Sequence, residues 1–204
     1  MNVVMVHGFA DTGRLFRTMG ATLHSRGHTC LAPTLEPRDG RLGIQDLSKK
    51  IDAFIEANVP RQAPLALVGF SMGAVVLRHY LQVRGGASRA RAFFSISGPH
   101  NGTWISYLYP GAGTRQMRLG SAFLRELDAG TAALSGLVLH TYRTPLDLMV
   151  APSTSARIRG VTERVVWCPL HSLMPSDPRV VNHIADELAR IDTSATPGLG
   201  YPPV

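Results

Sequence analysis

The sequence has few cysteines, few lysines and no long hydrophobic run. Its two cysteines, Cys30 and Cys168, lack the partner spacing of a zinc site, and we expect two free thiols, with a single disulfide between them as the alternative. No apolar run reaches the roughly 18 residues that a membrane-spanning helix needs, so stable membrane insertion is not expected.

Lysine occurs only at Lys49 and Lys50, so arginine supplies nearly all of the 21 basic residues and the net charge of +7. The arginines are scattered, and no basic run is longer than two residues. A nucleic-acid-binding protein concentrates its positive charge on one face, whereas scattered charge mainly serves solubility. We therefore expect no nucleic-acid partner, while a basic surface would still favour anionic substrates or anionic lipid.

The N-terminus passes directly from Met1 into the apolar segment Val3–Val6. It lacks the succession of a charged region, an apolar region and a cleavage site that marks a signal peptide. This start predicts a cytoplasmic protein, and a chain from which a signal peptide had been removed would begin in the same way.

Short apolar runs alternate with amphipathic stretches along the chain. Strands are predicted at 3–6, 29–33, 65–70, 90–97, 137–143 and 163–169, with helices after Gly13 and Ser71 and over 44–57 and 180–191. Alternating strands and helices predict one α/β domain over 1–192, with about six parallel strands and helices on both faces. The Pro- and Gly-rich segment 193–204 predicts a flexible C-terminal tail.

The pattern Gly-Phe-Ser-Met-Gly at 69–73 lies between a predicted strand and a predicted helix. A serine hydroxyl is a poor nucleophile unless it is exposed beside a base, and a tight strand-to-helix turn provides the exposure. The flanking glycines give such a turn room, and the first helix amide, that of Met72, can bind an oxyanion. We interpret Ser71 as a nucleophile; the alternative is a serine that caps the helix.

The partners of such a serine follow it in the order acid and then histidine. His171 follows the sixth predicted strand and is the candidate base, although a solvated loop histidine would look similar. Asp147 is the one acid in the segment 141–155, at the end of the fifth predicted strand, with Asp177 in a Ser-Asp-Pro turn as the alternative. The second oxyanion donor is expected at Phe9, after His7-Gly8, although a plain turn would also fit there.

In these motifs the sequence resembles the α/β-hydrolases, specifically small bacterial lipases and esterases. The resemblance rests on Val-His-Gly-Phe at 6–9, on 69–73, on Ser-Gly-Pro-His-Asn-Gly-Thr at 97–103, and on Asp147 and His171 in order. It implies the α/β-hydrolase fold with minimal or no cap, since the chain is short. It also implies Ser71 as nucleophile, His171 as general base and Asp147 as the carboxylate that orients it, with an oxyanion hole from Phe9 and Met72. This sequence has Phe70 at the position before the serine, where a histidine is common in that family. The difference affects the expected shape of the pocket.

These residues predict a serine hydrolase that cleaves small-molecule or lipid carboxylic esters through an acyl-enzyme, with no metal or cofactor. A thioesterase or an acyltransferase could use the same triad, because the triad does not encode the leaving group or the acceptor. The alternative of another class is a non-catalytic binding protein on a hydrolase scaffold.

Segment 102–136 is the least regular part of the sequence, with two short helical pieces expected near 104–108 and 121–127. Its apolar cluster at 104–109 could pack into the core or form a pocket wall or small flap. We expect an open site that hydrolyses soluble short- and medium-chain esters without a lipid interface.

His100 is expected to make a structural hydrogen bond rather than line the pocket. The methionines expected near an apolar acyl pocket are Met72, Met149 and Met174.

Overall fold

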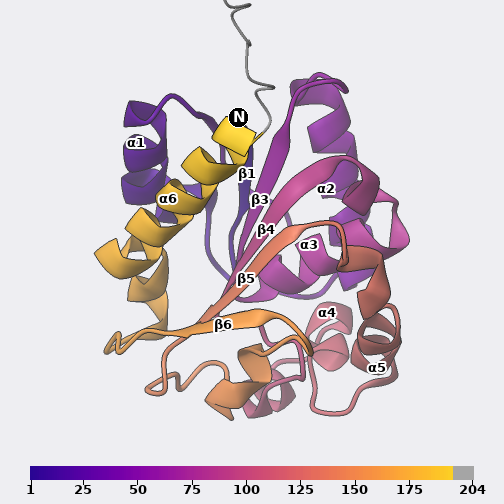
Figure 1. Cartoon of the computed structure of the whole chain (residues 1–204). Coiled ribbons are helices and arrows are strands. Elements are labelled where there is room, and N and C mark those ends of the chain that lie inside the picture. The colour runs from indigo at the N-terminus through magenta and orange to yellow at the C-terminus, as the bar shows by residue number, and fades with distance from the viewer. Residues whose placement is uncertain (195–204) are drawn as a thin grey trace, which may run out of the picture.

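One parallel sheet organises the computed structural model, which describes residues 1–194 (Figure 1). Within these residues the six strands lie in the order β2-β1-β3-β4-β5-β6, and every neighbouring pair is parallel. The strands are β1 (Asn2–Val6), β2 (Thr29–Leu31), β3 (Leu65–Phe70), β4 (Ala90–Ile96), β5 (Val138–Arg143) and β6 (Thr162–Val165). The predicted six-stranded parallel sheet is thereby confirmed.

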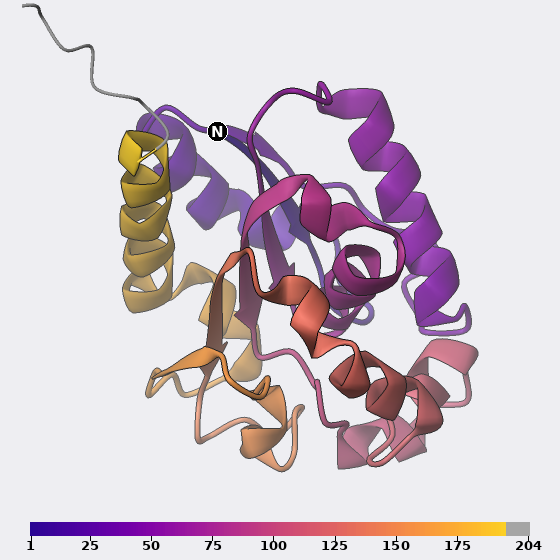
Figure 2. The same cartoon turned by 45° about the vertical axis from the view of Figure 1, so that its right-hand side comes forward.

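Helices cover both faces of the sheet. They are α1 (Arg17–Ser25), α2 (Ile44–Asn58), α3 (Met72–Val83), α4 (Ala112–Gln116), α5 (Ala122–Ala129) and α6 (Pro178–Ser194). Helices α1 and α6 lie on one face and α2 and α3 on the other, as two views of the ribbon show (Figures 1 and 2).

The alternation of side chains along each strand divides the core into two halves. In β1, Val4 and Val6 pack in the cluster that contains α2 and α3, whereas Val3 and Met5 pack in the cluster that contains α1 and α6. Successive side chains of a strand point to opposite faces, and here both faces are covered. This explains why the strands are continuous apolar runs in the sequence.

Two strands end two or more residues earlier than predicted. Strand β2 ends at Leu31 and β6 at Val165, whereas the apolar runs continue to Pro33 and Pro169. Proline has no amide hydrogen to donate to a strand ladder, and the Cys168 amide turns back to the Val166 carbonyl oxygen at 2.8 Å. Both runs therefore leave the sheet before their proline.

The last helix is longer than predicted. Helix α6 continues to Ser194, so the first two residues of the predicted tail are helical, and the rest of that prediction, 195–204, lies outside the described residues. None of the helices within 1–194 is long and apolar enough to cross a membrane.

Segment 102–136 divides into two parts. Its second part, which includes α5, packs into the core through Phe123, Leu124 and Leu127. Its first part begins with a short 3-10 helix over Trp104–Leu108, in which Trp104 is 62% exposed. The second part is therefore a core element, whereas the first reaches the core cluster through Met117 and leaves the 3-10 helix over Trp104–Leu108 largely at the surface.

Several histidines lie inside the fold. Burial lowers the pKa of six histidines in the described part of the chain below the ordinary value near 6.5, and that of His100 is lowered well below it. The six are His7, His28, His79, His100, His140 and His183. These imidazoles therefore stay neutral in the folded protein at a pH where the unfolded chain would protonate them.

We predict that the free energy of unfolding falls as the pH is lowered from 7.5 to 5.5. Below pH about 6.5 the unfolded chain binds more protons than the folded protein does. Each such histidine therefore lowers the free energy of unfolding by up to about 1.4 kcal/mol per pH unit. Urea unfolding at several pH values measures this slope. His28→Gln should reduce this slope, and a flat stability over this range would contradict the prediction.

Candidate active site

Ser71 lies in a strained turn between β3 and α3. Its φ of 52° and ψ of −124° lie in a region that favours glycine, yet the residue carries a side chain. The Ser71 amide donates to the Ile96 carbonyl oxygen at 2.9 Å, and its carbonyl accepts from the Ala74 amide at 3.0 Å. Neighbouring structure thus holds the strained backbone in place.

Two glycines beside Ser71 allow this turn. A Cβ on Gly73 would lie 2.2 Å from the Val6 carbonyl oxygen, and one on Gly69 would lie 2.4 Å from the Ala74 Cα. Both neighbours are backbone atoms that cannot move aside. The Gly-x-Ser-x-Gly spacing is therefore required by the close approach of α3 to β1 and β3.

His171 and Asp147 contact one another at the same edge of the sheet. His171 Nδ1 lies 2.8 Å from Asp147 Oδ2, and the two side chains are 11% and 1% exposed, respectively. The other carboxylate oxygen, Oδ1, accepts from the amides of Met149 at 2.9 Å and Val150 at 2.8 Å. These contacts fix the carboxylate. Because Nδ1 faces the acid, Nε2 is the histidine nitrogen that does not.

Asp177, the alternative acid, is bound elsewhere. Its carboxylate accepts from Arg179 Nη2 at 2.6 Å and Nε at 3.0 Å, and the hydrogen bond from Arg179 holds the pKa of Asp177 below its ordinary value. Its carbonyl oxygen accepts from the amides of Val180 and Val181, which begin α6. Asp177 therefore works as a helix-start residue, as its Ser-Asp-Pro context indicates.

Two threonines that sequence reasoning missed brace the loops of the acid and the histidine. Thr144 Oγ1 donates to the Cys168 carbonyl oxygen at 2.7 Å and ties the loop after β5 to the loop after β6. Thr103 Oγ1 donates to the Met149 carbonyl oxygen at 2.8 Å. No sequence pattern marks them, because each contact joins a hydroxyl to a backbone atom distant in the chain.

His7 orders the loop that carries Phe9. Its Nε2 lies 2.9 Å from the Leu35 amide and must accept that hydrogen, so Nδ1 carries the proton and donates to the Gly8 carbonyl oxygen at 2.8 Å. Burial lowers the pKa of His7, which favours this neutral form. The histidine of the His-Gly-Phe motif is thus a structural support.

The Phe9 and Met72 amides remain available for a ligand. No hydrogen bond within the described residues engages either amide, and both residues border the same cavity as Ser71. Met72 is the first residue of α3, whose N-terminal amides have no intrahelical partner and attract negative charge. Its side chain is buried in the core.

Two cavities meet at Ser71, and both are bordered by Phe9 and Met149. The wide cleft, of about 450 Å³, also includes Phe70, Leu146, Leu148, Leu170 and His171. The narrow pocket, of about 40 Å³, also includes Met72, Ile105, Tyr109, Met117 and Val150. Ser71 and His171 therefore share the wide cleft, and part of 102–136 forms a pocket wall.

Two further expectations concern side chains near the site. His100 is buried, and its Nε2 lies 2.7 Å from Ser95 Oγ, which is a structural hydrogen bond. Met174 is fully buried in the core beside α1 and α6 and lines neither cavity, so it is not a pocket residue.

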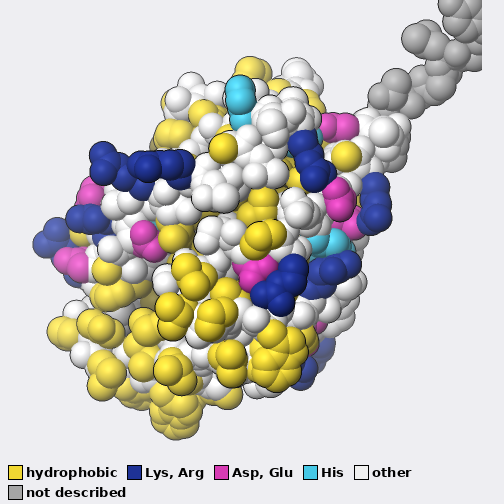
Figure 3. All heavy atoms as spheres, turned by 90° about the vertical axis from the view of Figure 1, so that its left-hand side faces the viewer, with side chains coloured by type: hydrophobic (Ala, Val, Ile, Leu, Met, Phe, Trp, Pro, Cys, Tyr) yellow, Lys and Arg dark blue, Asp and Glu magenta, His cyan; other side chains and the backbone are white. Residues whose placement is uncertain are grey.

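Exposed apolar side chains surround the wide cleft. Figure 3 shows hydrophobic side chains gathered toward the lower end of the molecule, where the strands end in Figure 1. The cleft residues Leu146, Leu148 and Leu170 are 47%, 80% and 57% exposed, respectively, and we call these three the apolar rim. Such a rim favours apolar ligands over charged ones.

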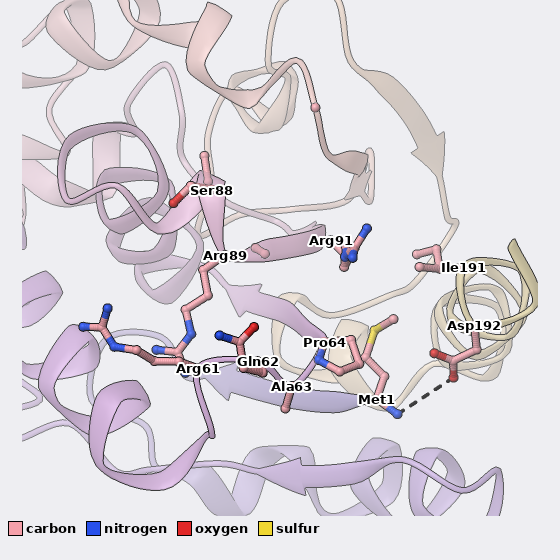
Figure 4. A pocket seen from close by; sticks show the side chains of 13 residues that line it. Met1, Arg61, Gln62, Ala63, Pro64, Ser88, Arg89, Arg91, Ile191 and Asp192 are labelled. Carbon is pink, nitrogen blue, oxygen red and sulfur yellow. Dashed lines mark ion pairs between the residues drawn. The ribbon is translucent and has the colours of Figure 1, made fainter. Parts of the chain in front are cut away.

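A larger cavity, of about 670 Å³, lies at the opposite edge of the sheet, beside Met1 (Figure 4). It is lined by arginines, of which Arg61 and Arg89 are both paired with Glu56. The hydroxyl of Ser88 in this cavity donates to the Gly85 carbonyl oxygen at 2.8 Å. No histidine is among the described residues that line this cavity, so we place the candidate chemistry at Ser71. Across 1–194, no three His, Cys, Asp or Glu side chains are grouped to hold a metal ion.

Comparisons with known proteins bear on the family and the fold. A family model described as the alpha/beta hydrolase family matches residues 3–202. The structure of Aspergillus fumigatus lipase B is similar over 92% of this chain and 52% of that chain, with a TM-score of 0.79 and 17% identity. This chain thus spans about half the length of that lipase.

Two further structures are similar over most of both chains. Bacillus licheniformis lipase BlEst2 matches over 92% of this chain and 91% of that chain, with a TM-score of 0.72 and 14% identity. A structure from work on carboxylesterases of Nitrososphaera gargenis matches over 95% and 92%, with a TM-score of 0.67 and 15% identity. At these identities the likeness shows the fold. A search of curated proteins found no match.

We predict that Gly73→Ala lowers the free energy of unfolding by about 3 kcal/mol or more, because the added methyl group overlaps the Val6 carbonyl oxygen. The matched control is Gly20→Ala in α1, where the nearest atom to the new Cβ is 3.6 Å away. That change should stabilise the protein by about 0.5–1 kcal/mol, since alanine favours a helix. Chemical denaturation measures both variants. A Gly73→Ala protein as stable as the wild type would show that α3 does not need its glycine.

Proposed function

Because the chain belongs to the alpha/beta hydrolase family, we propose that it cleaves carboxylic esters with Ser71 as the nucleophile. The observation that carries the proposal is the 2.8 Å contact between His171 Nδ1 and Asp147 Oδ2, beside a cleft that Ser71 and His171 share. The similar structures named as lipases and carboxylesterases support the choice of an ester bond.

In the first step, His171 acts as the general base. With Nδ1 bonded to Asp147, Nε2 is the nitrogen that takes the proton of Ser71 as its oxygen attacks the ester carbonyl carbon. Asp147 keeps the imidazole in this orientation and stabilises the positive charge that the ring acquires. The amides of Met149 and Val150 hold the carboxylate in place while this happens.

The negative charge of the tetrahedral intermediate is stabilised by the Phe9 and Met72 amides. Two backbone donors aimed at the developing oxyanion are a common source of rate enhancement in acyl transfer. The dipole of α3 adds to the effect at Met72, the first residue of that helix. The protonated His171 then gives its proton to the leaving alcohol, and water hydrolyses the acyl-enzyme by the same steps.

We predict that Ser71→Ala lowers kcat for a p-nitrophenyl ester by a factor on the order of 10⁶ without unfolding the protein. The nucleophile is lost while the turn remains. Initial rates and circular dichroism measure the two effects, and a fluorophosphonate probe should label the wild-type protein only. More than about 1% residual activity in clean protein would reject Ser71 as the nucleophile.

We further predict that Asp147→Asn lowers kcat by a factor on the order of 10⁴, because the amide no longer holds the required histidine tautomer. Asp177→Asn is the matched control, since Asp177 is bound to Arg179 and should keep near-normal kcat. Steady-state kinetics compares the two variants. A nearly active Asp147→Asn beside an inactive Asp177→Asn would mean that Asp177 is the acid.

A further inference from the structure

The two cavities at Ser71 differ in size and in their relation to the proposed base. The wide cleft has a volume of about 450 Å³ and includes His171, whereas the narrow pocket has a volume of about 40 Å³ and includes Met72. Because both cavities border Ser71, an ester bound there can place its acyl group in one cavity and its alcohol in the other. The positions of the base and the oxyanion donor decide which part enters which cavity.

The alcohol belongs on the side of His171. The histidine that takes the proton of Ser71 must afterwards give it to the leaving oxygen, so that oxygen has to lie within hydrogen-bond reach of the imidazole. His171 and its neighbours Leu170 and Ser172 line the wide cleft and not the narrow pocket. The leaving alcohol therefore extends into the wide cleft, and the acyl group enters the narrow pocket beside Met72.

The narrow pocket has room for only a short acyl group. Its volume of about 40 Å³ is less than a tenth of the 450 Å³ of the wide cleft. Its walls include Val150 and Met117, which are 1% and 5% exposed. The Thr103 amide donates to the Met117 carbonyl oxygen at 2.9 Å and anchors this wall. Packed walls resist expansion, so the narrow pocket favours acetyl and propionyl groups over longer acyl chains.

The wide cleft is suited to a large, uncharged alcohol. Leu148 of the apolar rim and Phe70 at its floor are apolar, and among the described residues that line it no arginine or lysine is present to bind an anionic group. Asp11 is the one carboxylate among these described lining residues, and its Oδ1 accepts from the Thr12 amide at 2.9 Å. The alcohol is thus neutral and mainly apolar.

We propose that this protein removes short acyl groups, acetyl or propionyl, from large apolar alcohols. The inference rests on the proposed function at Ser71 and adds the substrate class. Ser71 Oγ bonds to the acyl carbon, the bond to the alcohol oxygen breaks, and the alcohol leaves with the proton that His171 received from Ser71. Water then adds to the acyl carbon, the short carboxylic acid leaves, and the proton that His171 took from water returns to Ser71.

Two isomeric esters test the proposal on the intact protein. Hexyl acetate and ethyl hexanoate have the same atoms and similar hydrophobicity, but the long chain is on the alcohol in the first and on the acyl group in the second. We expect kcat/KM to be at least about 100-fold higher for hexyl acetate, measured below the solubility limit of both. Equal rates, or a preference for ethyl hexanoate, would overturn the inference while leaving the hydrolase function intact. No turnover of either ester and no fluorophosphonate labelling would instead reject the proposed function, and the inference with it.

Variants of the pocket wall test the same assignment. Ile105→Ala enlarges the narrow pocket and should raise kcat/KM for ethyl hexanoate by about 10-fold relative to hexyl acetate. Tyr109→Ala opens another part of the wall and should change the ratio in the same direction. It replaces Ile105→Ala as the test if that variant is poorly folded. The control Leu148→Ala, in the wide cleft, should lower turnover of hexyl acetate without improving ethyl hexanoate. If the wall variants fold and the ratio of kcat/KM between the two esters is unchanged, the acyl group lies elsewhere.

Discussion

The close approach of α3 to the end of β1 is the constraint on which the rest of the site depends. Gly73 is pressed against the Val6 carbonyl oxygen so closely that no Cβ fits between them. This contact brings the first turn of α3 beside the loop after β1, which carries Phe9. It also requires the sharp reversal at Ser71, whose φ is 52°. A single backbone contact thus positions the serine and the two amides proposed to stabilise its intermediate.

The site joins two regions of different construction. Ser71 follows β3, a central strand whose residues are all buried, so packing on both faces of the sheet fixes its position. Asp147 and His171 lie on loops after β5 and β6, at one side of the sheet, and side-chain hydrogen bonds do the positioning there. The bond from Thr144 to the Cys168 carbonyl oxygen couples these two loops, which packing alone would leave independent.

The sequence predicts the sheet well because buried parallel strands are uninterrupted apolar runs, as in Leu65–Phe70. Strand ends were less predictable, since the run toward Pro169 leaves the sheet at Val165. Chain order also predicts which residues reach the carboxyl edge, where Asp147 and His171 meet. The volumes of the two cavities could not be predicted, because they depend on how the first part of 102–136 packs against other loops.

The position of β6 affects the order in which this protein would lose activity and structure. It is a four-residue edge strand that pairs only with β5, and the loop beyond it carries His171. Edge elements open locally at a lower free-energy cost than central strands do. Detachment of β6 would separate the histidine from Ser71 while β1, β3 and β4 stay assembled. Loss of the proposed activity on mild heating would thus report local opening at this edge, ahead of global unfolding.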